Sequence, residues 1–89
     1  MSVGLDNPEF RQMADGVKSV TSKPSNDTPL KLYAYFKQAT VGDNNTDSPG
    51  LFELTQKEKW KAWAELKGME QTDATLRYIE LAKEVIARQ

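Results

Sequence analysis

Apolar residues recur every three or four positions in four separate segments of this 89-residue chain, and no segment has a strand pattern. Such spacing places side chains on one face of an α-helix, whereas a half-buried strand alternates apolar and polar residues. Stretches containing proline or glycine separate the four segments, and these residues interrupt helices. The chain is therefore predicted to be all-α, with four helices.

Local signals mark where the predicted helices begin and end. Pro8 and Pro29 suit the first turns of the first and second helices, because a proline lacks only an N–H that is unpaired there. Glycines end the second and third helices, at Gly42 and Gly68. Polar residues able to accept hydrogen bonds from free backbone N–H groups are candidates for the caps. They are Asp6 or Asn7, Asn26 or Asp27, a Thr55–Glu58 capping box, and Glu70 or Thr72.

The composition restricts what can hold the fold together and what chemistry is possible. The chain has no cysteine and no histidine, so neither disulfides nor a Cys/His zinc site can stabilise it. Without histidine it also lacks the commonest general base and metal ligand. Its length is that of one domain, residues 1–89, with a single thin core. These features disfavour an enzyme, and we expect no cofactor and no metal.

Charge and hydropathy narrow the range of partners. Twelve basic residues face thirteen acidic ones, for a net charge of −1, so a nucleic-acid binder is not expected. The first residues have no secretory pattern, and no apolar run is long enough to span a bilayer. We expect a cytoplasmic protein.

The connection between the second and third predicted helices, residues 42–54, is long and rich in Asn, Asp, Gly and Pro. Three of its residues match the first oxygen ligands of a calcium-binding EF-hand loop: Asp43, Asn45 and Asp47. The match then fails, because Ser48 stands where the loop needs glycine and Leu54 where it needs glutamate. A turn-rich loop is the preferred interpretation.

The second helix carries apolar residues in two rows rather than one. One row is Leu30, Tyr33 and Ala34, and the other is Leu32, Phe36 and Ala39. Lys37 lies on the Tyr33 row, where a buried, unpaired ammonium group would be costly. Lys18 and Lys59 also end apolar rows. A groove with a basic lip, suited to an aromatic ring, phosphates and an apolar tail, explains this pattern. The alternative explanation is that the aliphatic parts of these lysines lie along the edges of the core while their ammonium groups remain in water.

The segments YAYFKQATVGDNNTDSPG (residues 33–50) and KEKWKAWAELKG (residues 57–68) resemble the signature region of the acyl-CoA-binding protein family. With TSKPS before them and Tyr78 after them, the resemblance covers nearly the whole chain. It implies a four-helix, up-down-down-up bundle with a long loop between the second and third helices. It also implies a protein that binds long-chain fatty acyl-CoA and carries it without catalysis, as a pool former in lipid metabolism.

The resemblance further implies a set of ligand-binding residues. Lys37 and Lys59 would converge on the 3′-phosphate of coenzyme A, Tyr33 and Tyr78 would frame the nucleotide, and Lys18 would approach the phosphates. Other binding residues in the matched helix are Ala34, Tyr35 and Phe36, and the residues expected to face the acyl chain are Pro29 and Leu30. Trp60 and Trp63 are interpreted as core and groove wall.

Two positions depart from the family pattern. Phe36 replaces a tyrosine, which keeps the ring and loses the hydroxyl, and Pro29 stands where a long apolar residue is frequent. If Phe36 acts through ligand stacking, its removal should reduce affinity and change stability little.

Two other functions remain open at this stage. An α-helical protein-interaction domain would use the exposed aromatics to dock a partner. A small thioester hydrolase would need an Asp or Glu base. A monomer is the default, with acyl-CoA as ligand and transient contacts to acyl-CoA-using enzymes or membrane surfaces as possible interactions.

Overall fold

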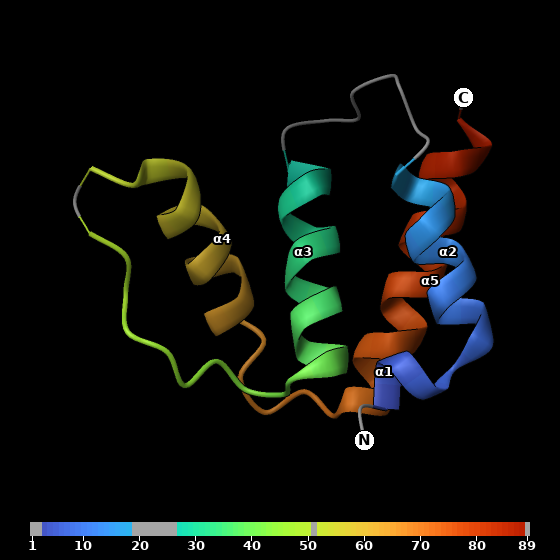
Figure 1. Cartoon of the computed structure of the whole chain (residues 1–89), viewed down its shortest axis with the longest axis horizontal. Coiled ribbons are helices and arrows are strands. Elements are labelled where there is room, and N and C mark those ends of the chain that lie inside the picture. The colour runs from blue at the N-terminus through green and yellow to red at the C-terminus, as the bar shows by residue number, and fades with distance from the viewer. Residues whose placement is uncertain (1–2, 19–26, 51, 89) are drawn as a thin grey trace.

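The computed structural model describes residues 3–18, 27–50 and 52–88. Its elements are five helices, labelled in Figure 1: α1 (Val3–Asp6), α2 (Pro8–Lys18), α3 (Asp27–Thr40), α4 (Leu54–Ala64) and α5 (Gln71–Ala87). The described residues include no strand. The predicted all-α class is confirmed, with the four expected helices and one additional short helix at the beginning.

α3 lies at the centre of the molecule, between α4 on one side and α5 on the other (Figure 1). α2 packs against α5, and α4 contacts no helix other than α3 among those described. The four longer helices run up, down, down and up in chain order (Figure 1). This is the predicted topology.

The long loop, residues 41–53, follows from the parallel direction of α3 and α4. A helix of fourteen residues is roughly 21 Å long at 1.5 Å per residue. After α3 ends, the chain must run back over that length, because α4 starts at the end of the bundle where α3 started (Figure 1). A short turn could join only antiparallel neighbours.

The predicted start of α2 is confirmed. The Asn7 side-chain oxygen Oδ1 accepts hydrogen bonds from the backbone N–H groups of Glu9 (2.9 Å) and Phe10 (3.2 Å). Two of the backbone donors left free at a helix start are thereby paired. Of the two candidates for the start of α3, Asp27 is already helical and Asn26 lies outside the described residues.

The predicted capping box of α4 is wrong. The helix begins two residues earlier than a cap at Thr55 requires, at Leu54, so Thr55 is its second residue and Glu53 occupies the cap position. Glu53 makes no side-chain capping hydrogen bond. Glu70 is the cap residue of α5, as predicted, but it makes no such bond either.

Gly42 follows the end of α3, as expected, whereas α4 ends at Ala64 and not at the predicted Gly68. Gly42 and Gly68 have φ angles of 98° and 92°, and no other described residue has a positive φ. Both conformations are strained for residues that carry a Cβ atom. Gly42 marks the point where the chain turns from α3 into the crossing loop.

The short helix α1 was not predicted from the sequence. Its Gly4 packs directly on α3, where an added Cβ atom would lie 3.0 Å from Ala39 Cβ. Such a contact is tighter than most that real Cβ atoms make, so glycine favours this close approach of α1 to α3. This contact explains a glycine that sequence patterning left without a role.

The core lies between α2, α3 and α5. Its buried apolar residues are Phe10, Leu32, Ala39, Ala74, Tyr78, Ile79, Ala82 and Val85. Phe10 is completely buried, and it stacks on Phe36 with ring centroids 5.4 Å apart. None of the described helices is long and apolar enough to cross a membrane.

Candidate functional site

Two lysines from different helices converge on one tyrosine ring, where α3 faces α4. Lys37 Nζ lies 6.0 Å and Lys59 Nζ 5.5 Å from the centroid of the Tyr33 ring. Lys37 Nζ also lies 5.7 Å from the Trp63 ring. We call Tyr33, Lys37, Lys59 and Trp63 the cationic cluster. An ammonium group within about 6 Å of a ring centroid is attracted by the ring's negative face.

Helix geometry supplies half of this arrangement and tertiary packing supplies the rest. Tyr33 and Lys37 are four residues apart on α3, and Lys59 and Trp63 are four apart on α4, so each pair shares one helix face. The packing of α4 against α3 then turns the two faces toward each other.

Among the described residues, no carboxylate forms an ion pair with the cationic cluster. The ion pairs found among the described residues join Lys18 to Asp15 and Lys83 to Glu9, and neither involves Lys37 or Lys59. Two ammonium groups beside one ring repel each other and are strong hydrogen-bond donors. An anion placed between them would relieve that repulsion, so the cluster can bind a phosphate.

The crossing loop fixes α4 through the two tryptophans. Trp63 Nε1 donates a hydrogen bond to the Gly42 carbonyl oxygen (2.8 Å), and Trp60 Nε1 donates to the Thr46 carbonyl oxygen (3.0 Å). The Asn44 side chain donates to the Trp60 carbonyl oxygen (3.1 Å). Trp63 is buried and Trp60 partly so. Both indole N–H groups thus find partners in the loop that carries the chain from α3 to α4.

Asp43, the first of the calcium-like loop positions, has a different role. Its Oδ1 accepts hydrogen bonds from the Gly68 backbone N–H and from the Gln38 side chain, each 2.9 Å long. Both bonds hold the pKa of the Asp43 carboxyl below its ordinary value, and the bond from Gly68 has the larger effect. In the part of the chain that the structure describes, no group of three His, Cys, Asp or Glu residues could hold a metal ion.

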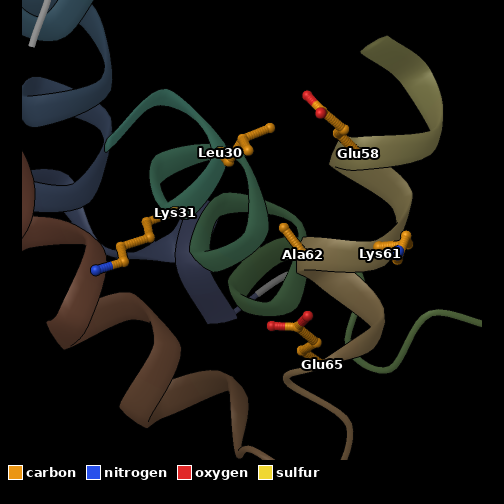
Figure 2. A pocket seen from close by; sticks show the side chains of 6 residues that line it. All are labelled: Leu30, Lys31, Glu58, Lys61, Ala62 and Glu65. Atoms are coloured by element: carbon orange, nitrogen blue, oxygen red, sulfur yellow. The ribbon is translucent and has the colours of Figure 1, made fainter. Parts of the chain in front are cut away.

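An open groove runs between α3 and α4, with a volume of about 320 Å³. Its lining residues are Leu30, Lys31, Glu58, Lys61, Ala62 and Glu65. Figure 2 shows Leu30 reaching from α3 toward α4, and Ala62 pointing from α4 toward α3. The groove therefore has an apolar floor between charged side chains, which is suited to a ligand with an apolar part.

Some predicted site residues lie away from the cationic cluster. Lys18 is exposed at the end of α2, 3.8 Å from Asp15. Pro29 is exposed in the first turn of α3, whereas Ala34 is buried. Tyr35 packs against the core and lines a hollow with residues of α5. Residues two apart on a helix do not share a face, so Tyr35 and Tyr33 serve different surfaces.

Phe36 and Tyr78 belong to the aromatic core, which corrects one expectation. Their ring centroids lie 5.9 Å apart, and both rings contact Phe10. Tyr78 is only 5% exposed, and its burial raises the pKa of the phenol. Phe36 therefore packs in the core, and ligand stacking cannot be its only role. The expectation that its removal changes stability little conflicts with these contacts.

Sequence reasoning omitted two residues from the site. Trp63 was assigned to the core or groove wall, yet its ring is one of the two that Lys37 faces. Ala62 lines the groove opposite Leu30. The four-residue spacing between Lys59 and Trp63 was a signal for the first. No local signal identified Ala62, because its role depends on the neighbouring helix.

Comparison with known proteins gives one consistent result. The family model for acyl-CoA-binding protein matches residues 7–82. The chain is 53% identical over 79 residues to acyl-CoA-binding protein homolog 1 of Caenorhabditis elegans, covering 89% of this chain and 92% of that protein. It is 47% identical over 79 residues to the acyl-CoA-binding protein of Saccharomyces cerevisiae, covering 89% and 91%.

Solved structures agree in fold. The crystal structure of acyl-CoA-binding protein 2 from Oryza sativa superposes with a TM-score of 0.85 at 36% identity, covering 90% of this chain and 87% of that one. The solution structure of the yeast acyl-coenzyme A-binding protein gives a TM-score of 0.74 at 46% identity, covering 91% and 94%.

Proposed function

Because the chain belongs to the acyl-CoA-binding protein family, we propose that it binds long-chain fatty acyl-CoA and carries it as an intracellular pool former in lipid metabolism. The observation that carries this proposal is that the same two helices, α3 and α4, supply both the cationic cluster and a groove with an apolar floor. Lys37 and Lys59 face one tyrosine ring and have no carboxylate partner among the described residues. The family does not favour the alternative, a protein-interaction domain.

In the proposed complex, the cationic cluster holds the charged end of the ligand. Lys37 and Lys59 bind the 3′-phosphate of coenzyme A, since both can donate hydrogen bonds to one phosphate group. Tyr33, whose ring both lysines face, offers a surface on which the adenine can stack. Lys18, which is exposed at the end of α2 and lies 3.8 Å from Asp15, would approach the remaining phosphates.

The apolar end of the ligand lies in the groove between α3 and α4. Leu30 and Ala62 form its apolar floor, and Pro29 in the same turn as Leu30 extends that surface toward solvent. Each methylene removed from water stabilises the complex by about 0.8 kcal/mol. Chain length should therefore have a strong effect on affinity.

We further propose that the chain is a single domain, residues 1–89, that works in the cytoplasm as a monomer. Its role is to carry its ligand, with transient contacts to acyl-CoA-using enzymes or membranes, and not to catalyse a reaction. The absence of histidine and cysteine from the sequence supports a carrier over a thioester hydrolase, because those residues are the usual bases and nucleophiles.

Calorimetry with acyl-CoA esters of increasing length tests the proposal, with free coenzyme A and free fatty acid as controls. We expect one-to-one binding that tightens with each added pair of carbons, much weaker binding of free coenzyme A, and little binding of the fatty acid. Equal affinity for free coenzyme A and its palmitoyl ester would exclude the groove as the tail site. Incubation with the thioester should leave it intact.

A further inference from the structure

Two large apolar side chains at the beginning of α4 are left in water. Phe52 is 100% exposed and Leu54 is 70% exposed, the two highest values among the exposed large hydrophobic residues described. They flank Glu53 and lead directly into the helix. We call Phe52 and Leu54 the apolar tip. Neighbouring exposed apolar side chains of this size mark a surface that contacts something other than water.

The position of the apolar tip relates it to the groove. α3 and α4 run in the same direction (Figure 1), so their first turns lie at the same end of the bundle. Leu30 lines the groove from the first turn of α3, and Leu54 is the first residue of α4. The apolar tip therefore lies at the end of the molecule where the groove between the two helices begins.

The charges around the apolar tip favour an anionic partner. Residues 52–61 carry three lysines and two glutamates. Lys57 and Lys61 follow Leu54 by three and seven positions, which places them on its face of α4 together with Glu58. The cap residue of α4, Glu53, makes no side-chain capping hydrogen bond, and the positive end of the helix dipole lies there as well. An apolar group bordered by lysines and a helix N-terminus is suited to a bilayer surface with anionic phosphate groups.

We propose that the apolar tip is a membrane-docking surface that inserts Phe52 and Leu54 among the lipid headgroups. Contact of this kind is interfacial, since none of the described helices could span a bilayer. The role in transfer rests on the proposed function: docking brings the open end of the groove to the surface in which an acyl tail is dissolved. The tail can then pass between bilayer and groove with less exposure to water.

The test measures binding of the ligand-free protein to vesicles that contain no acyl-CoA. Vesicles of phosphatidylcholine mixed with phosphatidylglycerol are compared with phosphatidylcholine alone, by co-sedimentation. We expect binding to the anionic vesicles that weakens with added salt. Phe52→Ser should lower the partition coefficient about tenfold or more, because burial of a phenylalanine ring is lost. Leu76→Ser is the matched control, since Leu76 is 52% exposed but lies on α5.

A labelled variant locates the contact directly. The chain has no cysteine, so Phe52→Cys provides one attachment site for an environment-sensitive dye, and Leu76→Cys provides the control. Blue-shifted emission with anionic vesicles is expected for the label at position 52 and not at position 76. No vesicle binding by the wild type, or equal effects at both positions, would overturn the proposal.

Calorimetry in vesicle-free buffer separates this proposal from the proposed function. Phe52→Ser should bind acyl-CoA with the affinity of the wild type. A large loss of acyl-CoA affinity in this variant would mean that the apolar tip contacts the ligand, and it would overturn the proposed docking surface. Failure of the wild type to bind acyl-CoA would instead contradict the proposed function, and the vesicle measurements without ligand would still decide the membrane contact.

Discussion

The side-chain amide of Gln38 donates a hydrogen bond to Asp43 Oδ1 over 2.9 Å and a second to the Met69 carbonyl oxygen over 2.8 Å. Gln38 is completely buried. Because Asp43 also accepts from the Gly68 N–H, one amide joins α3, the start of the crossing loop and the turn before α5. These bonds tie together the chain segments on both sides of α4, which packs on α3 alone among the described helices.

Acid should weaken this connection. The folded-state pKa of Asp43 is below its ordinary value of 3.8, so the stabilisation is present above that value and is lost as pH falls through the folded pKa. Asp43→Asn removes the charge and keeps an acceptor. We therefore expect a lower free energy of unfolding at neutral pH, and a smaller further decrease as the pH falls. Urea denaturation from neutral pH to about pH 2 measures both. Asp47→Asn, in the same loop, is the control for the loss of a carboxyl group.

The two lysines of the cationic cluster should act on the same phosphate. Lys37→Ala and Lys59→Ala are each expected to weaken acyl-CoA binding by about 1 to 3 kcal/mol, and the double variant should lose less than the sum. Esters of dephospho-CoA, which lack the 3′-phosphate, should bind the wild type poorly and be little affected by either change. Lys83→Ala on α5 is the control. If the lysine variants still preferred acyl-CoA over its dephospho form as strongly as the wild type does, the assignment of the 3′-phosphate to this site would be wrong.

Removal of the Phe36 ring should reduce stability as well as affinity. The ring stacks on Phe10 and meets Tyr78, but it remains partly exposed. We expect Phe36→Ala to cost an amount near the lower end of the roughly 3 to 5 kcal/mol typical of buried phenylalanine. Phe36→Tyr should change stability by less than about 1 kcal/mol. Urea denaturation and calorimetry on the same samples separate the two effects, and unchanged stability of the alanine variant would place the ring outside the core.

Tyr78 should make the fold sensitive to alkali. Burial raises its pKa above the ordinary value of 10.0, so above that pH the unfolded chain releases a proton that the folded chain retains. The unfolded state is then favoured, and stability should fall as pH rises past about 10. Tyr78→Phe should reduce this fall, as measured by thermal unfolding at increasing pH. Tyr35→Phe controls for the loss of a phenol, and an equal effect in both variants would contradict the assignment to Tyr78.

Short-range patterns in the sequence determined the helical class, a cap at Asp6 or Asn7, the glycine after α3 and the placement of Lys37 on the Tyr33 row. Each of these depends on residues within one or two helical turns, where spacing and backbone preference fix geometry. The family resemblance added the bundle topology, which the parallel directions of α3 and α4 then confirmed (Figure 1).

Only the tertiary structure decided which of these residues meet. The approach of α4 to α3 brings Lys59 to the Tyr33 ring, and the fit of Gly4 against Ala39 accommodates a helix that patterning missed. Phe36 joins the core because Phe10 and Tyr78, distant in sequence, supply its neighbours. Such contacts depend on how whole helices pack, and a local pattern of apolar residues is compatible with more than one packing partner.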